Sequence, residues 1–295
     1  MNFDSAEIQY VPLLAAVAPW LLKVTKKLES YRIDPEDRRK FSALFGFCAD
    51  AKWEPGTIHP DSPGIPHPIN VSAMADFSKI FVSGLFRRHR PLKQVNFIKN
   101  MNAEGNWATF GGPVDSILAQ KVFGWKYEEK RFKRTNKSQV FPIEFDLQGG
   151  RGAKMGRIIN GKRVEESGRW AILDHTTSRI LEPTVNHDGD ISKDYLTVTC
   201  IPNPFGDSLK PHPKILFLTG SHIAGLSARE ILLKHISALY DNVATGGNFQ
   251  VVFECDKIKH KGGFSKPEPG HSKIVCGPVN LARNGPGFVA MSTNL

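Results

Sequence analysis

Cysteine is scarce in this sequence of 295 residues, and the cysteines that occur stand far apart. They are Cys48, Cys200, Cys255 and Cys276. No C-x-x-C pair is present, and neither H-x-E nor H-E-x-x-H occurs. Zinc sites need close ligand pairs, and disulfide scaffolds need more cysteines in a shorter chain. The sequence therefore predicts free thiols in a reducing compartment and no metal site.

Long hydrophobic runs are also missing. The most apolar stretch covers residues 11–22 and contains Pro12 and Pro19, so it falls short of the ~20 residues that span a bilayer. Asp4 and Glu7 precede it, whereas a secretory signal begins with basic residues. We therefore expect a cytoplasmic protein with no membrane association. Its apolar N-terminal helix would pack on the core or contact a protein partner.

No complete catalytic motif is present. The nucleophile elbow G-x-S-x-G does not occur, and no acyl-transfer triad is evident. Gly220 and Gly225 are spaced as in the phosphate loop G-x-x-x-x-G-K-[S/T], but Leu226 stands in place of the lysine. The β- and γ-phosphates of a bound nucleotide would lose their main charged partner. A Walker-type NTPase is therefore disfavoured, and the sequence leaves open whether the protein is an enzyme.

Proline and glycine divide the chain into segments. Residues 53–70 hold five prolines and two glycines, so neither a helix nor a central strand can pass through them. We expect a linker there, between a helical appendage at residues 1–52 and an α/β core at residues 71–256. Residues 257–295 are again rich in glycine and proline, and we expect them to be irregular.

The core shows the apolar runs of an α/β fold. Residues 214–219 and 249–254 are typical of strands covered on both faces, and residues 227–240 between them have a helical pattern. This order favours a right-handed βαβ crossover. A hairpin insertion is predicted at about residues 126–200, around the turn Asn160–Gly161. The predicted fold is α/β, with a parallel or mixed Rossmann-like sheet, β-hairpin insertions and an N-terminal helical appendage.

Two glycine turns, at residues 111–115 and 220–227, each follow a predicted strand and precede a predicted helix. Such turns can present backbone N–H groups to an anion, and the helix dipole adds to the attraction. Open α/β sheets bind ligands at the carboxyl ends of their strands, where two such turns can share one ligand. The alternative is that the glycines only permit tight turns. The predicted binding residues are Gly111, Gly112, Asp115, Gly220, Ser221, Gly225 and Ser227.

The leading functional hypothesis is binding of an anionic small molecule, most simply a nucleotide or a nucleotide-derived ligand. On this hypothesis the protein is a ligand sensor or an interaction protein, and its cofactor is unknown. An alternative is an enzyme that processes a nucleotide or phosphoester. His222 would then act as acid or base with Asp207, Glu254 or Asp256, because imidazole titrates near neutral pH.

Positive charge exceeds negative charge, with 39 Lys and Arg against 29 Asp and Glu. Part of the excess lies in segments that also contain Trp125, Tyr127 and Phe132. Basic loops can hold a phosphate backbone while aromatic rings stack on bases, so a nucleic-acid-binding or scaffold protein is a further alternative. A solvated face or a surface for an acidic protein would have the same composition. The predicted nucleic-acid contacts are Lys130, Arg131, Lys133, Arg134, Arg151, Lys154 and Arg157.

Overall fold

A computed structural model describes most of the chain from residue 33 to residue 281. The described residues are 33–57, 66–82, 105–129, 131–135, 141–147, 155–159, 162–166, 171–186, 190–205, 213–221, 223–243, 247–261 and 264–281. The chain divides into two compact units, residues 1–38 and 39–295. In the first unit, Asp34 begins helix α2 (Pro35–Phe45), where its Oδ1 accepts a hydrogen bond of 2.8 Å from the Glu36 N–H.

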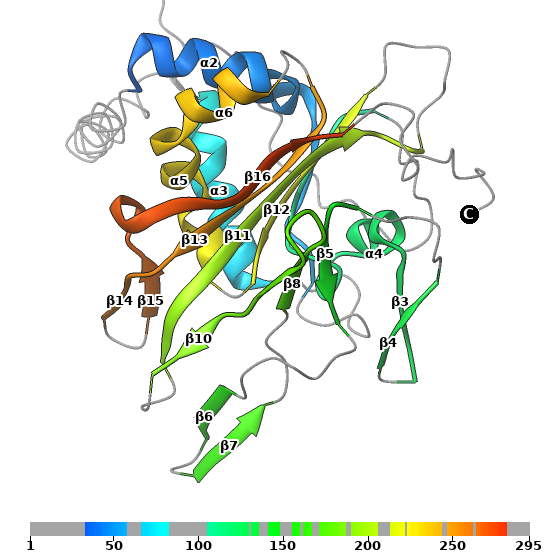
Figure 1. Ribbon diagram of the computed structural model, residues 1–295, viewed down its shortest axis with the longest axis vertical. Coiled ribbons are helices and arrows are strands. Elements are labelled where there is room, and N and C mark those ends of the chain that lie inside the picture. Colours follow the sequence, from blue (N-terminus) through cyan, green and yellow to red (C-terminus); the bar gives the residue numbers. More distant parts are fainter. Residues whose placement is uncertain are drawn as a thin grey trace, which may run out of the picture. The chain divides into compact units, whose positions relative to one another are not determined.

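A mixed sheet forms the centre of the second unit (Figure 1). Its order is β1 (Lys52–Glu54), β2 (Trp107–Phe110), β12 (Lys214–Gly220), β11 (Ile191–Pro202), β13 (Phe249–Cys255) and β16 (Ser272–Asn280), and β10 (Thr184–Val185) also pairs with β11. The pairs β1–β2 and β2–β12 are parallel, and the other pairs are antiparallel. The predicted α/β class with a mixed sheet is therefore confirmed.

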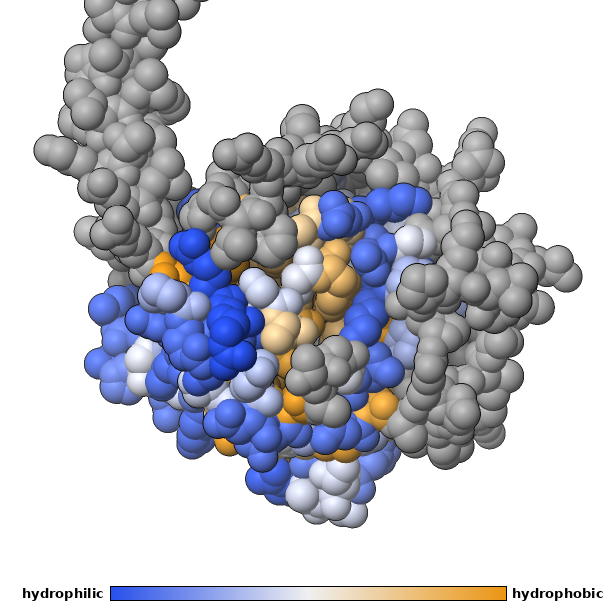
Figure 2. All heavy atoms as spheres, turned by 90° about the horizontal axis from the view of Figure 1, so that it is seen from above, coloured by the Kyte–Doolittle hydropathy of each residue, from blue (hydrophilic) through white to orange (hydrophobic). Residues whose placement is uncertain are grey.

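Helices α3 (Pro68–Val82), α5 (Ala228–Lys234) and α6 (Ile236–Asn242) lie on one face of this sheet (Figure 1). Aromatic rings fill the space between α3 and the sheet. Phe77 of α3 lies 5.6 Å from Phe110 of β2, and Trp53 stacks on Phe110 at 5.7 Å between ring centroids. On the surface seen from above, hydrophobic residues of the described part lie near the middle, with hydrophilic residues around them (Figure 2).

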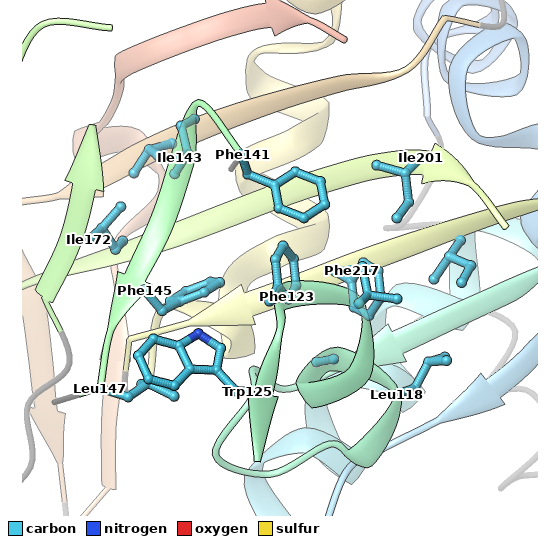
Figure 3. Packing of buried hydrophobic residues seen from close by; sticks show 14 of the residues in the cluster. Leu118, Phe123, Trp125, Phe141, Ile143, Phe145, Leu147, Ile172, Ile201 and Phe217 are labelled. Atoms are coloured by element: carbon cyan, nitrogen blue, oxygen red, sulfur yellow. The ribbon is translucent and has the colours of Figure 1, made fainter. Parts of the chain in front are cut away.

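The opposite face of the sheet is covered by α4 (Ile117–Phe123) and a small sheet of β5 (Ile143–Asp146), β8 (Ala171–Asp174) and β9 (Arg179–Leu181). Figure 3 shows Phe123 of α4 between the side chains of β5 and Phe217 of β12. The centroids of Phe123 and Phe217 are 5.1 Å apart. Because Leu216 and Leu218 are also buried, β12 is covered on both faces, as its continuous apolar run predicted.

Three hairpins pair only with themselves among the described residues. In the first, β6 (Met155–Ile159) pairs with β7 (Lys162–Glu166) on either side of the predicted Asn160–Gly161 turn, which itself lies outside the described residues. The other two are β3 (Trp125–Glu128) with β4 (Arg131–Arg134), and β14 (Ile258–Lys261) with β15 (Phe264–Pro267). The helix predicted at residues 227–240 is present as α5 and α6, which meet at His235.

The predicted linker and the predicted irregular C-terminal segment both contribute to folded structure. Residues 52–54 form β1 and bury Trp53, and α3 begins at Pro68. The helix η1 (Gly46–Asp50) precedes β1. Near the end of the described chain lie β14 (Ile258–Lys261), β15 (Phe264–Pro267), η3 (Pro269–His271) and β16. The prediction for residues 257–281 was therefore wrong. Gly277 has φ +80° beside a register shift, and Pro278 lies on an edge strand, where glycine and proline are tolerated.

All four cysteines are buried free thiols. In the part of the chain that the structure describes, no helix is both long enough and apolar enough to cross a membrane.

Candidate functional site

The two glycine turns meet at the carboxyl ends of β2 and β12. These strands are parallel neighbours, with Phe110 opposite Leu218. The Gly111 N–H donates to the Leu218 carbonyl at 3.1 Å, and the Thr219 hydroxyl donates to the Gly111 carbonyl at 3.1 Å. The first turn is thus bonded directly to the carboxyl end of β12, where the second turn begins.

A cavity of about 240 Å³ lies between the turns. Its apolar lining residues, here called the apolar wall, include Val114, Phe145, Leu147, Ile191 and Ile223. Its polar lining residues, here called the polar wall, are His67, Asn70, Asp115, Thr219 and Ser221. Of the predicted binding residues, Gly112, Asp115, Gly220 and Ser221 line this cavity.

Steric demands explain the glycines of both turns. Gly111 has φ +116°, and a Cβ there would lie 2.7 Å from Nδ2 of Asn70. A Cβ on Gly220 would lie 2.6 Å from the main-chain nitrogen of Gly225. Both contacts are too close for any side chain, so these turns need glycine whether or not a ligand binds.

The amides of the second turn are largely used within the protein. Asp194 of β11 is fully buried, and its Oδ2 accepts hydrogen bonds from the N–H groups of Ile223 (2.7 Å) and Ala224 (2.6 Å). The Ser221 N–H donates to the Tyr195 carbonyl at 2.8 Å. An anion at this turn would have to displace a buried carboxylate. The backbone amides that were predicted to attract an anion are therefore occupied at these positions.

Gly225 and Ser227 belong to η2 (Ala224–Ser227) and are not among the residues that line the cavity. Ser227 is fully buried, and its hydroxyl donates to the Pro267 carbonyl at 3.1 Å, so its side chain does not cap α5. In contrast, the Ser116 hydroxyl caps α4 by accepting a hydrogen bond of 3.1 Å from the Ala119 N–H.

Of the predicted acid–base residues, the described Glu254 and Asp256 do not line the cavity. His222 and Asp207 lie outside the described residues. Glu254 lies on β13, where its carboxylate accepts 3.0 Å and 2.7 Å bonds from the Tyr195 hydroxyl and Lys273. The hydrogen bonds and charge of Lys273 and the Tyr195 bond outweigh the effect of burial, so the pKa of Glu254 lies below its ordinary value. Such a carboxylate stays ionised and paired, so it is a poor general acid.

The structure brings two further residues to the cavity that the sequence did not indicate. His67 and Asn70 come from the proline-rich segment that was predicted to be a linker. The His67 Nδ1 accepts a hydrogen bond of 3.3 Å from the Ile69 N–H at the start of α3. The proline at residue 68 is typical of a helix start, so the pair His67–Pro68 could have indicated a titratable side chain beside the beginning of a helix.

A buried acid, Glu54, lies close behind the polar wall. It is 5% exposed, and the Ser116 hydroxyl donates to its Oε2 at 2.9 Å. Burial raises the pKa of Glu54 to about 7, and the negative charge of Asp115 adds to the rise. Burial also raises the pKa of Asp115, while His67 and the hydrogen bond from Asn70 act in the opposite direction. The two acids therefore hold protons more tightly than exposed carboxyl groups do.

The basic residues of the β3–β4 hairpin make contacts within the protein. Arg134 pairs with Glu144, and its guanidinium lies 4.6 Å from the ring centroid of Trp125. Lys133 pairs with Glu129 at 2.7 Å. The rings of Tyr127 and Phe132 also pack on each other. Arg131 is exposed on β4 and Arg157 lies on β6, whereas Lys130, Arg151 and Lys154 lie outside the described residues. A nucleic-acid interface on this hairpin stays a prediction, and Arg134 has a structural role there.

Comparison with known proteins does not identify the cavity. No protein-family model, no curated protein and no solved structure matches the chain. Within the described ranges, His, Cys, Asp and Glu form no cluster of three or more that could hold a metal ion. The function is therefore inferred from the side chains of the cavity.

Proposed function

We propose that the protein binds a small nucleotide-derived molecule in the cavity between the two glycine turns, as a ligand sensor or an interaction protein. One observation carries the proposal: β2 and β12 end side by side, and the turns that follow them line one cavity. Ligands of open α/β sheets bind outside the carboxyl ends of the strands, and a Rossmann-like site would lie at this edge.

The size of the cavity limits the ligand. Pockets for drug-sized ligands measure roughly 300–1,000 Å³, and this cavity of about 240 Å³ lies below that range. A dinucleotide is too large to be enclosed here, whereas a single nucleoside unit is close in size. The apolar wall with Phe145 suits the face of a planar base, and the polar wall offers groups that fix its orientation.

The charge of the lining determines where a phosphate can lie. Asp115 and His67 are the titratable residues among the described lining residues, and neither lysine nor arginine is present. Among the described lining residues, an anionic group inside the cavity would have a carboxylate as its neighbour and no permanently charged cation. On our proposal, any phosphate of the ligand therefore extends from the cavity towards solvent.

Filling the cavity tests this proposal. Val114 is half-buried on the first turn, and the indole of Val114→Trp is expected to occupy the ligand's place. Nucleosides, mononucleotides and dinucleotides are screened by thermal unfolding. A ligand at about 100 times its Kd stabilises the folded state by about 2.7 kcal/mol, which raises Tm by roughly 5–10 °C for a chain of this size.

A matched variant separates blocking from a general effect of tryptophan. Ile180 on β9 is 43% exposed and does not line the cavity, so Ile180→Trp should keep the full shift. Folded Val114→Trp, checked by its own cooperative melting curve, should lose the shift. A shift that persists in Val114→Trp, or a wild-type protein that responds to no compound, would show that the proposal is wrong.

A further inference from the structure

The carboxylate of Asp115 is held firmly on the polar wall of the cavity. Nδ2 of Asn70 donates to Oδ2 at 3.2 Å, and the main-chain N–H and hydroxyl of Thr57 donate to the Asp115 carbonyl at 2.6 Å and 3.1 Å. Gly56 and Gly111 pack closely against the Asp115 side chain, because a Cβ on either glycine would lie 3.0 Å from Cβ of Asp115. Within the described part of the chain, the structure assigns no hydrogen-bond donor to Oδ1.

A second polar group of the wall also has no partner among the described residues. Ser221 is 8% exposed, and its Oγ is buried without a hydrogen bond. Buried hydroxyls are nearly always paired, and an orphaned one beside a cavity indicates a missing partner. The neighbouring Thr219 hydroxyl, in contrast, already donates to the Gly111 carbonyl. Oδ1 of Asp115 is thus a group of the wall that a ligand can satisfy, whereas Oγ of Ser221 has almost no accessible surface.

The electrostatic surroundings of Asp115 disfavour an additional negative charge. Glu54 is close enough for the two acids to repel each other. Burial has the largest effect on the pKa of Asp115 and raises it, while His67 acts in the opposite direction. A phosphate next to Asp115 would face both acids. A hydroxyl group, in contrast, donates a hydrogen bond to a carboxylate without adding charge.

We infer that the cavity selects an uncharged ribonucleoside, whose ribose hydroxyls donate to Oδ1 of Asp115. The inference rests on the proposed function and names the class of its ligand. The base packs on the apolar wall of Val114, Phe145, Leu147, Ile191 and Ile223. An acidic side chain that binds ribose hydroxyls is a general device of α/β nucleotide-binding folds. Here this acid replaces the backbone amides as the group that recognises the ligand.

Calorimetric titration of the full chain tests the inference. The probes are the common ribonucleosides, their 2′,3′-dideoxy analogues, their 5′-monophosphates and putrescine. At least one ribonucleoside should bind no more weakly than its monophosphate. Its dideoxy analogue should bind at least about tenfold more weakly, as expected for the loss of a hydrogen bond to a charged group.

Asp115→Asn assigns the effect to the carboxylate. This variant should bind the ribonucleoside at least about tenfold more weakly than the wild type and should no longer distinguish it from the dideoxy analogue. Glu128→Gln on β3 is the control, because Glu128 is an exposed carboxylate that does not line the cavity. It should bind like the wild type. If Asp115→Asn does not fold, the inference is tested by comparing the affinities of the wild type for the ribonucleoside and for its dideoxy analogue.

The outcomes separate this inference from the proposed function. Binding of a nucleotide with much weaker binding of its nucleoside would overturn the inference and leave the proposed function in place. Equal affinity for the ribonucleoside and its dideoxy analogue would also overturn the inference alone. So would an Asp115→Asn variant that binds the ribonucleoside as tightly as the wild type does. Binding of putrescine but of no nucleoside would show that the carboxylate recognises an amine. Binding of none of the probes would overturn both.

Discussion

Replacement of Glu54 by glutamine is expected to remove a large part of the pH dependence of stability. The folded-state pKa of Glu54, about 7, exceeds its ordinary value of 4.5 because of burial, with a smaller contribution from Asp115. The folded state therefore binds the proton more tightly than the unfolded state. The contribution of this group to stability is fully present below about pH 4.5 and is lost as the pH rises through about 7.

The size of this effect follows from the shift in pKa. Between pH 5 and pH 8 the wild-type protein should lose about 2–3 kcal/mol of unfolding free energy through Glu54 alone. In Glu54→Gln this loss should disappear, because the amide is neutral at every pH and its oxygen can still accept the hydrogen bond from Ser116. Urea unfolding at both pH values measures the difference between the two proteins.

A surface acid is the control for this experiment. Hydrogen bonding to Lys259 and the charges of nearby lysines lower the pKa of Glu268, so this group titrates below pH 5 in both states. Glu268→Gln should therefore leave the fall in stability between pH 5 and pH 8 unchanged. An equal pH dependence in the wild type and Glu54→Gln would contradict the prediction.

Replacement of Gln250 by leucine should destabilise the protein by about 4 kcal/mol. Gln250 is fully buried on β13, and its side-chain amide makes the hydrogen bonds to the backbone of β5 that a neighbouring strand would make. Its Oε1 accepts from the Ile143 N–H at 3.0 Å, and its Nε2 donates to the Ile143 carbonyl and to the Thr199 hydroxyl, each at 3.1 Å. Leucine preserves the volume but leaves both backbone groups of Ile143 buried without a partner. The loss is measured by denaturant unfolding.

Gln120 provides a matched comparison. It is also a buried glutamine, 8% exposed on α4, but its Nε2 has no hydrogen-bond partner among the described residues. Gln120→Leu removes an unsatisfied amide group, so it should be neutral or stabilising. A similar loss of stability in both variants would mean that the bonds to Ile143 do not hold the small sheet of β5 on the main sheet.

Local patterns in the sequence predicted the individual elements better than their assembly. The apolar run at residues 214–219 and the pair Asn160–Gly161 are local evidence, because a strand buried on both faces is continuously apolar and an Asn–Gly pair favours a hairpin turn. Trp53 and β16 had no such signal. Their neighbours are prolines and glycines, and only the pairing of β1 with β2 and of β16 with β13 makes them strands.

The candidate site was predicted by position but not by chemistry. Strand–glycine–helix order indicated both turns, and parallel pairing places them together. The carboxylate of Asp194, which occupies the amides of Ile223 and Ala224, comes from a strand about 30 residues upstream. His67 likewise reaches the cavity from a distant segment. No local pattern reports such long-range contacts, and they determine the charge of the site.

The hydrogen bond between Thr219 and Gly111 joins residues 108 positions apart in the chain. Bringing such distant segments together has an entropic cost that is recovered only when β2 and β12 pair, so we expect this part of the sheet to form late during folding. A nascent chain that ends before β12 has only one of the two turns. On the proposed function, a ligand could bind only after synthesis has passed Ile223 of the cavity lining, while β13 and β16 have still to be made.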